Sequence, residues 1–430
     1  MTLSTEPVLL LQVNSMTYDV FVLGAGMVGT GCAHYLQESG KTVALVDKGA
    51  PGMQTSHGNA GIIQREAIQP YAFPRQLSVI LTAAANRRTD IRYQLPAVPS
   101  FIRPLRQYYH YSAPARYAGI AREYASLISL SLETHNELIH KAGAEALTGT
   151  HQWLALSRTD RHLEESYLSA DLLAEQGVSH TKLSAEDLKL REPDISPLFP
   201  GAVMWTSPRT IRDPSALVQS YVDLFLSGGG TFISADAQTL SRTRDGLWEI
   251  RNDQGDVSQA RQVVVALGPW STLLTAKFGY QPPLFSKRGY HRHYKTQSGK
   301  QLNNWVLDAE KGFLLAPMNR GIRLTTGAEL ARLDDPQTPR QLEQLEPVAR
   351  QDFPLGERAD DETWSGSRPC FPDMKPVIGE VPGVSHMWCA FGHGHQGFTL
   401  GPATGMLLAQ MMTGQKTAIE MQPFRPGRWT

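Results

Sequence analysis

The stretch from Tyr18 to Gly29, YDVFVLGAGMVG, begins as an apolar strand and ends in a glycine-rich turn that opens a helix. A second apolar run from Thr42 to Val46 follows and ends at Asp47. This succession of strand, glycine turn, helix, strand and acid is the βαβ fingerprint of dinucleotide-binding proteins. The sequence therefore predicts an α/β fold that starts with a Rossmann-like unit.

The glycines of this turn have separate tasks. Gly24 permits the tight turn, Gly26 lets the backbone approach a pyrophosphate, and Gly29 lets the helix lie close to the sheet. Asp47 is placed to accept hydrogen bonds from ribose hydroxyls. The fingerprint does not by itself distinguish NAD from FAD. The predicted cofactor contacts of this unit are Gly24, Gly26, Met27, Val28, Gly29, Asp47 and Lys48.

Composition excludes several classes of protein. The chain has 430 residues, 41% of them apolar, and 41 basic residues balance 41 acidic ones. Because no net positive charge is available to hold a phosphate backbone, we expect no nucleic-acid partner. The three cysteines are too few and too widely spaced for a disulfide framework, and we expect a cytoplasmic protein. His393 and His395 have no third ligand nearby in the sequence, so no metal site is predicted.

Four further segments indicate which family of dinucleotide-binding proteins the chain resembles. Thr55–Gly61 (TSHGNAG) follows the second strand, and the apolar strand 262–267 runs into Gly268-Pro-Trp-Ser271. Near the C-terminus, Trp364–Gly379 reads WSGSRPCFPDMKPVIG, and Gly392–Phe398 (GHGHQGF) precedes a helix predicted from about Pro402 to Met412. Together with the fingerprint, these segments resemble the D-amino-acid oxidase superfamily of FAD enzymes, most closely its bacterial D-amino-acid dehydrogenase branch.

The resemblance implies non-covalent FAD in a Rossmann-like domain of the glutathione-reductase type. In some relatives a cysteine upstream of the Pro-Asp pair holds the flavin covalently. The matching position here is Gly366, and Cys370 lies too close to Pro372. The resemblance adds these cofactor contacts: Thr55, Ser56, Asn59, Ala60, Gly61, Ala266, Gly268, Trp270, Gly394, His395, Gln396, Gly397 and Phe398.

The domains are expected to interleave along the chain. We assign residues 17–75, 212–275 and 362–417 to the FAD-binding domain, and 76–211 and 276–361 to an α+β substrate domain with a mixed antiparallel sheet. Residues 1–16 are expected to be a loose leader, and 418–430 a C-terminal tail. Within these domains the periodicity predicts a helix over 118–142, and Asp213-Pro214 opens another helix that runs through Phe225.

Candidate catalytic residues come mainly from the same resemblance. In relatives the arginine at the position of Arg368 pairs with the substrate carboxylate, a task that suits a planar guanidinium. A structural ion pair is the alternative for this side chain. Arg288, Tyr290 and His291 occupy a segment that lines the substrate site in relatives, although a solvated basic loop is the alternative. His57 lies within the flavin motif, either as a group that changes charge or as a neutral donor.

The predicted activity is oxidation of a D-amino acid or a related amine by hydride transfer to the flavin. The product is an imino acid that hydrolyses to a 2-oxo acid and ammonia. A glycine- or sarcosine-type amine oxidase, a hydroxy-acid dehydrogenase, an NAD-linked dehydrogenase and a flavoprotein subunit of an electron-transfer complex remain alternatives. The electron acceptor is a quinone of the respiratory chain or oxygen.

One stretch of the sequence suggests where the reduced flavin could pass its electrons to an acceptor. Arg75 to Arg116 is basic, aromatic and rich in proline, and the bacterial dehydrogenases have a counterpart of it. It either rests on the inner face of a membrane, through Arg87, Arg88, Arg103 and Arg106, or covers the active site as part of the substrate domain.

Overall fold

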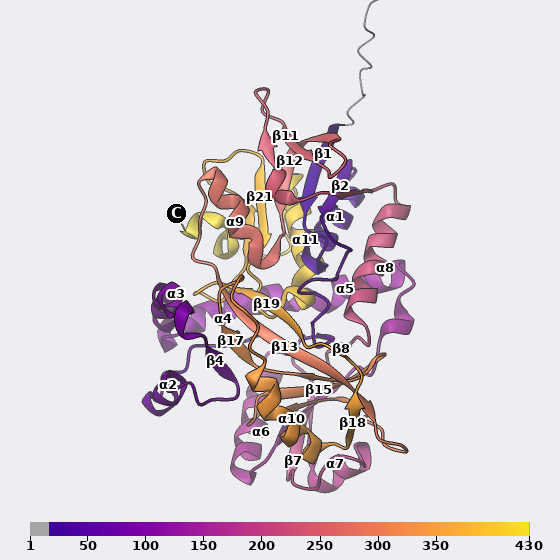
Figure 1. The fold of residues 1–430 in the computed structure, drawn as a ribbon, viewed down its shortest axis with the longest axis vertical. Helices are drawn as coiled ribbons and strands as arrows, with labels where there is room; N and C mark the ends of the chain where they lie inside the picture. Colours follow the sequence, from indigo (N-terminus) through magenta and orange to yellow (C-terminus); the bar gives the residue numbers. More distant parts are fainter. Residues whose placement is uncertain (1–16, 430) are drawn as a thin grey trace, which may run out of the picture.

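Two sheets form the frame of the molecule, one above the other in Figure 1, and the chain passes between them several times. The computed structural model describes residues 17–429, so the predicted leader lies outside the described residues. The α/β fold class with a second, mixed sheet is confirmed.

The first sheet has eight strands around a parallel core ordered β9-β2-β1-β12-β21. Its central strands are buried on both faces, which explains their continuous apolar sequence. The long strand β12 changes partner along its length, pairing antiparallel with β11 at its start and parallel with β21 at its end. Its strands are β1 (Thr17–Leu23), β2 (Val43–Asp47), β9 (Thr231–Ser234), β10 (Ser241–Arg242), β11 (Trp248–Arg251), β12 (Val257–Val265), β20 (Val377–Glu380) and β21 (Met387–Phe391).

Three helices pack near this sheet: α1 (Met27–Glu38), α8 (Pro214–Ser227) and α11 (Gly397–Met412). Glycines bring α1 and α11 into close contact. A Cβ on Gly31 would lie 2.8 Å from the carbonyl oxygen of Gly401, and one on Gly405 would lie 2.3 Å from Gly31. The absence of these side chains lets the N-terminus of α11 reach the same place as the N-terminus of α1.

The second sheet has eleven strands, and β13 is its hub, pairing with β16, β17, β18 and β19. The helices α6 (Asp160–Ala174), α7 (Ala185–Arg191) and α10 (Arg340–Asp352) lie at its lower end in Figure 1. The strands are β4 (Ile91–Tyr93), β5 (Trp153–Ser157), β6 (His180–Ser184), β7 (Gly201–Trp205), β13 (Phe285–Thr296), β14 (Trp305–Asp308), β15 (Phe313–Met318), β16 (Gly321–Thr325), β17 (Ala328–Leu330), β18 (Leu355–Arg358) and β19 (Trp364–Cys370).

The remaining elements connect or flank the sheets. The strands β3 (Ile62–Ile63) and β8 (Arg209–Thr210) pair with each other in a separate two-stranded sheet. Helices α2 and α3 project at one side in Figure 1. The bounds are α2 (Leu77–Ala84), α3 (Val98–Tyr111), α4 (Pro114–Ser129), α5 (Ser131–Lys141) and α9 (Ser271–Thr275).

Three boundaries differ from the sequence predictions. Strand β19 falls in the range 362–417 that we assigned to the FAD-binding domain, but it pairs over its whole length with β13 of the second sheet. The helix predicted over 118–142 is two helices, α4 and α5, that meet at Leu130. The helix that starts at Asp213-Pro214 is confirmed, and the Asp213 side chain accepts a hydrogen bond from the Ala216 N–H at 3.0 Å.

The third difference concerns α11, which begins at Gly397 and contains Pro402 in its second turn. The prediction placed Pro402 at the first turn, where a missing N–H costs nothing. Inside the helix Pro402 has no N–H for the carbonyl oxygen of Phe398. His135 of α5 faces that oxygen instead, with its Nε2 at 2.9 Å. A tertiary hydrogen bond thus replaces the helical one.

Candidate functional site

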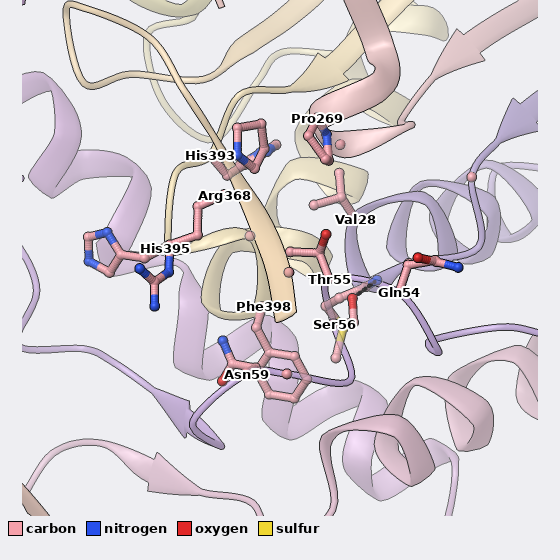
Figure 2. Close-up of a pocket in the computed structure, with 18 of the residues that line it drawn as sticks. Val28, Gln54, Thr55, Ser56, Asn59, Pro269, Arg368, His393, His395 and Phe398 are labelled. Atoms are coloured by element: carbon pink, nitrogen blue, oxygen red, sulfur yellow. Dashed lines mark hydrogen bonds between the residues drawn. The ribbon is translucent and has the colours of Figure 1, made fainter. Parts of the chain in front are cut away.

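A cavity of about 700 Å³ lies where the two sheets meet. Figure 2 shows Val28, Ser56 and Pro269 on one side of it and Arg368 and His395 on the other. The lining joins the glycine turn after β1, the loop 55–61, the end of β12, strands β13 and β19, and the loop before α11. Segments far apart in the sequence therefore form a single site.

The glycine turn forms one end of the cavity. Gly24 has a φ of +104°, and a Cβ there would lie 2.6 Å from the carbonyl oxygen of Ala266. A Cβ on Gly29 would lie 1.8 Å from the carbonyl oxygen of Gly24, so the absence of a side chain lets the first turn of α1 lie close to the glycine turn. Asp47 accepts from the Ala25 N–H at 2.8 Å and the Gly49 N–H at 2.9 Å. Lys48 also lines the cavity and lies 3.5 Å from Asp236.

The loop 55–61 lies beside the glycine turn. Ser56 Oγ accepts from the Met27 N–H at 3.1 Å, and Thr55 Oγ1 donates to the carbonyl oxygen of Ser367 at 3.3 Å. Asn59 Oδ1 accepts from the Gly61 N–H at 2.8 Å, which closes the loop on itself. Side chains of this loop therefore connect the first helix to a strand of the second sheet.

Arg323 of β16 holds the same loop from the other side. Its Nη1 donates to the carbonyl oxygens of His57 at 3.0 Å and Asn59 at 2.5 Å. Its Nε donates to His293 Nε2 at 2.9 Å, and His293 Nδ1 lies 2.5 Å from Asp360. Burial lowers the pKa of Arg323 to about 10, which leaves the guanidinium charged at neutral pH.

The loop before α11 closes the opposite wall. Gly394 (φ +61°) and His395 of this loop line the cavity together with Gly397 and Phe398 of the first turn of α11. The His395 ring packs against Tyr71 with centroids 4.8 Å apart and the ring planes tilted by 38°, and burial lowers the pKa of His395 to about 3. His395 is therefore neutral at pH 7. The predicted contacts Ala60, Ala266, Gly268 and Trp270 also lie on the lining.

Arg368 is a half-buried cation on this wall. Its Nη1 donates to the carbonyl oxygen of Gly327 at 2.7 Å and its Nη2 to that of Thr326 at 3.4 Å. Burial lowers the pKa of Arg368, and no ion pair with it is found among the described residues. The alternative of a structural ion pair is therefore not what residues 17–429 show.

A buried carboxyl lies behind the lining. Glu66 Oε1 accepts from Trp153 Nε1 at 2.9 Å and from Gln64 Nε2 at 3.0 Å, and both donors line the cavity. Gln396 Nε2 in turn donates to Gln64 Oε1 at 2.7 Å. Desolvation by burial raises the pKa of Glu66 to about 7. Glu66 Oε2 is buried and has no hydrogen-bond partner in the described chain.

Two candidate substrate residues point elsewhere. Arg288 does not line the cavity, because its guanidinium donates to the carbonyl oxygens of Arg332, Asp335 and Pro336. Tyr290 contributes to the lining, but its hydroxyl donates to Glu329 at 2.5 Å. The prediction that the Arg288 side chain contacts substrate is therefore not supported by the geometry.

Both candidate histidines lie behind the lining. His57 Nδ1 is 2.6 Å from Ser215 Oγ, and the His291 ring stacks on Trp364 with centroids 4.7 Å apart. Burial lowers the pKa of each, so both rings are neutral at pH 7 and the option that His57 changes charge loses support. Gly29, Gly61 and Gln396 also support the wall from behind rather than line it.

Sequence reasoning missed several residues of the lining. Tyr71 sits in a stretch without clear periodicity, and Trp153 sits in a strand that reads as ordinary core. Asp236 and Gln238 follow β9, where nothing but their position after a parallel strand points to a site. The other missed lining residues include Gln54, Gln64, Leu307, Leu314 and Trp364.

The residues present fit a dinucleotide. At Gly26 a Cβ would stand 3.3 Å from Ser56 Oγ, so the missing side chain leaves the backbone open to a phosphate at the N-terminus of α1. Asp47 lies at the end of β2, as ribose recognition requires. The apolar side chains of Ile62, Leu314 and Phe398 offer a surface for a flat ring system. No group of three or more potential metal ligands comes together in the part of the chain that is described.

Comparison with known proteins identifies the same chemistry. Residues 19–411 match the model of the DAO family, described as FAD dependent oxidoreductase. The chain is 28% identical to a D-amino-acid oxidase of Bradyrhizobium diazoefficiens, over 95% of this chain and 98% of that protein. It is also 28% identical to a D-amino acid dehydrogenase of Chromohalobacter salexigens, over 94% and 97%. Glycine oxidase from Geobacillus kaustophilus superposes with a TM-score of 0.71 at 20% identity, covering 95% and 98%.

Proposed function

Because the chain belongs to the DAO family of FAD-dependent oxidoreductases, we propose that its substrate is an amino acid, and more narrowly a D-amino acid. Two relatives named D-amino-acid oxidase and D-amino acid dehydrogenase, aligned over nearly their whole length, support the D configuration. The observation that carries the proposal is Arg368, a half-buried guanidinium on the cavity wall with no ion pair among the described residues.

Arg368 supplies what an amino-acid carboxylate needs. Two of its nitrogens donate to backbone carbonyls, which fix the plane of the guanidinium, and carbonyls do not neutralise its charge. A partly desolvated charge without a counter-ion is costly, so a carboxylate that enters the cavity gains a strong, oriented partner. This partner would set the position of the α-carbon.

Bound FAD supplies the two-electron acceptor for the α-carbon hydrogen. The amine loses a proton as the carbon–nitrogen double bond forms, and water then hydrolyses the imino acid to a 2-oxo acid and ammonia. The protein's own contribution is mainly orientation and exclusion of water. Trp153, Leu307, Leu314 and Phe398 provide the apolar wall that excludes it.

The test is anaerobic loss of flavin absorbance on mixing the holoenzyme with D- and L-amino acids, N-methyl amino acids and hydroxy acids. We expect D-amino acids to reduce the flavin and Arg368→Ala to raise their half-saturating concentration about 100-fold, as a broken buried charge pair requires. Arg161→Ala, on an exposed side chain of α6, is the control. Reduction by hydroxy acids alone, or unchanged binding in Arg368→Ala, would refute the assignment.

A glycine- or sarcosine-type oxidase is the second candidate, favoured by the superposition on glycine oxidase. The same panel separates the two, since glycine and sarcosine would then reduce the flavin faster than D-amino acids with larger side chains. The acceptor is identified by turnover with oxygen or with a soluble quinone.

We further propose that α2, α3 and the loop between them contact an anionic membrane surface. Leu77, Leu81, Leu95 and Ile102 are exposed by 60% or more of their surface. Residues 75–116 contain seven arginines and one acidic residue, Asp90, which pairs with Arg88. An exposed apolar surface flanked by arginines matches the interface of an anionic bilayer. None of the helices among residues 17–429 is long and apolar enough to cross a bilayer.

Co-sedimentation with lipid vesicles tests this contact. The holoenzyme should sediment with vesicles that contain phosphatidylglycerol and not with pure phosphatidylcholine, and the double variant Leu77→Ser/Leu81→Ser should lose binding. The control is Leu168→Ser/Leu172→Ser, an equally exposed leucine pair on α6. Absence of binding to anionic vesicles, or equal loss in both variants, would contradict the proposal.

A further inference from the structure

One buried carboxyl next to the cavity has no cation to balance it. Glu66 exposes 6% of its surface, and no ion pair with it is found within residues 17–429. The buried Asp308 and Asp352, in contrast, share the guanidinium of Arg158. Both donors to Glu66 reach the same oxygen, Oε1, whereas Oε2 is buried and has no partner in the described chain. A buried oxygen without a donor is costly above all when it is charged, so this site favours the neutral acid.

The two donors to Glu66 belong to the cavity wall. Trp153 Nε1 donates from β5 at 2.9 Å, Gln64 Nε2 donates from the segment after β3 at 3.0 Å, and both side chains line the cavity. The oxygen of the Gln64 side chain accepts from Gln396 Nε2 at 2.7 Å, and the Gln64 backbone N–H donates to Thr399 Oγ1 at 3.2 Å. Gln396 and Thr399 belong to the start of α11. One carboxyl oxygen thus sets the orientation of an indole and an amide that a ligand in the cavity would meet.

The charged and titratable groups that face Glu66 are few. They are Arg65, its neighbour in the chain, and Tyr71, which lines the cavity and also lies in the field of Arg368. Burial raises the pKa of Tyr71, so the phenol is neutral at pH 7. Arg65 Nη1 is buried without a hydrogen-bond partner in the described part of the chain. An ionised Glu66 would therefore draw donors to Oε2 from Arg65 or Gln64, and the wall would rearrange.

We propose that Glu66 is a positioning residue of the oxidation reaction: as the neutral acid it holds Trp153 and Gln64 in the orientation that places the substrate. Desolvation raises the pKa of Glu66 to about 7, so the neutral form prevails below pH 7 and is lost as the pH rises above it. A wall that rearranges on ionisation no longer holds the substrate in the reactive geometry. This inference rests on the proposed function, which places the substrate in this cavity.

The test compares anaerobic flavin reduction in the wild type and in Glu66→Gln between about pH 5.5 and pH 8.5. The reductant is the compound of the substrate panel that reduces the flavin fastest, whatever its class. Any titration of the substrate itself is the same in both proteins, so the ratio of their limiting rates isolates Glu66. The ratio of wild type to Glu66→Gln should fall about 10-fold from the acidic to the basic end, the effect of one hydrogen bond lost from the wall.

Two further variants separate positioning from mere burial. Glu66→Leu offers no acceptor to Trp153 and Gln64, so it should reduce flavin about 10-fold more slowly than Glu66→Gln at every pH. Glu192→Gln is the matched control, because Glu192 is also buried and has no cation in the described chain, but accepts from backbone N–H groups of residues 303 and 304 away from the cavity lining. Its ratio to the wild type should not change with pH.

Binding of propionate, followed through the flavin absorbance of the holoenzyme, is a second readout that needs no turnover. Its Kd should rise with pH about 3-fold more in the wild type than in Glu66→Gln, because ionised Glu66 adds a negative charge behind the wall.

The outcomes separate this inference from the proposed function. A constant rate ratio between wild type and Glu66→Gln, or a Glu66→Leu protein as fast as Glu66→Gln, would overturn the role of Glu66. Reduction by a hydroxy acid alone would refute the proposed function, and the rate ratio would still decide the role of Glu66. If no compound reduced the flavin, the pH dependence of propionate binding would decide it, and absence of that binding as well would overturn both.

Discussion

Replacing Glu66 with glutamine should change how stability depends on pH. Glu66 is buried, and desolvation raises the pKa of its carboxyl from 4.5 to about 7 in spite of donors from Trp153 and Gln64. A raised pKa means that the folded protein keeps a proton that the unfolded chain loses. The folded state therefore loses stability as the pH rises through the interval from 4.5 to about 7.

The magnitude follows from the two pKa values. A rise from 4.5 to about 7 corresponds to about 3 kcal/mol, since each pKa unit is worth about 1.4 kcal/mol. The penalty is small near pH 4.5 and complete above pH 7. Glu66→Gln keeps an acceptor for Trp153 and Gln64 but cannot ionise. A chain of 430 residues unfolds with an entropy near 0.9 kcal/mol/K, so about 3 kcal/mol corresponds to about 3 °C in Tm.

The assay is thermal unfolding of the two holoenzymes between about pH 5 and pH 8.5. The Tm of Glu66→Gln minus that of the wild type should rise by about 2 to 3 °C across this range, whatever its starting value. Glu362→Gln, at an exposed position, should give a constant difference. If the Glu66→Gln and wild-type curves ran parallel, the carboxyl would be ionised throughout, and the reasoning from burial would be refuted.

Three further substitutions test the cofactor site and the fold. Gly26→Val should abolish FAD retention in purified protein, because the new side chain fills the space beside Ser56. The control Gly119→Val, at a position on α4 with open space around it, should retain the yellow flavin. Equal flavin content in the two variants would contradict the assignment of the phosphate site to Gly26. Arg323→Met should raise the Kd for FAD about 10-fold, because two backbone carbonyls of the loop 55–61 lose their hydrogen-bond donor. Fluorescence titration of the apoprotein with FAD measures this Kd. An unchanged Kd would show that the loop keeps its shape without Arg323. Asp213→Ala removes the cap of α8 and should cost about 1 kcal/mol, or about 1 °C in Tm, with Asp213→Asn retaining most of it.

The sequence predicted best what depends on near neighbours in the chain. The turn after β1 places Gly24, Gly26 and Asp47 within a single βαβ unit, so spacing alone locates that end of the cavity. The cap at Asp213 is likewise a contact over three residues. The start of α11 was predicted wrongly, at Pro402, because local sequence does not show which distant group can replace a missing N–H. A hydrogen bond with His135, more than 260 residues away, satisfies the carbonyl of Phe398 that the proline leaves free.

The substrate end of the cavity could not be predicted in the same way, because strand alternation and register decide it. Lys287, Arg288 and Tyr290 are near neighbours in β13, yet Arg288 and Tyr290 turn to Glu329 whereas Lys287 turns to the face that carries Arg368. The amino-acid pattern of this basic run does not show which side chains of β13 face Glu329 and which share a face with Arg368. That information lies in the pairing of β13 with β19.

The same pairing explains why a glycine is required in the basic run. Gly289 lies opposite Gly366, and the Arg368 guanidinium occupies the space that a side chain at Gly289 would fill. A slip of one residue would place Ser367 or Pro369 on the cavity face in place of Arg368. The proposed selectivity of the cavity for carboxylates thus depends on sheet register, whereas its dinucleotide end depends on the turn after β1 and the neighbouring loop 55–61. Substitutions between β13 and β19 should therefore change the choice of substrate before they release the cofactor.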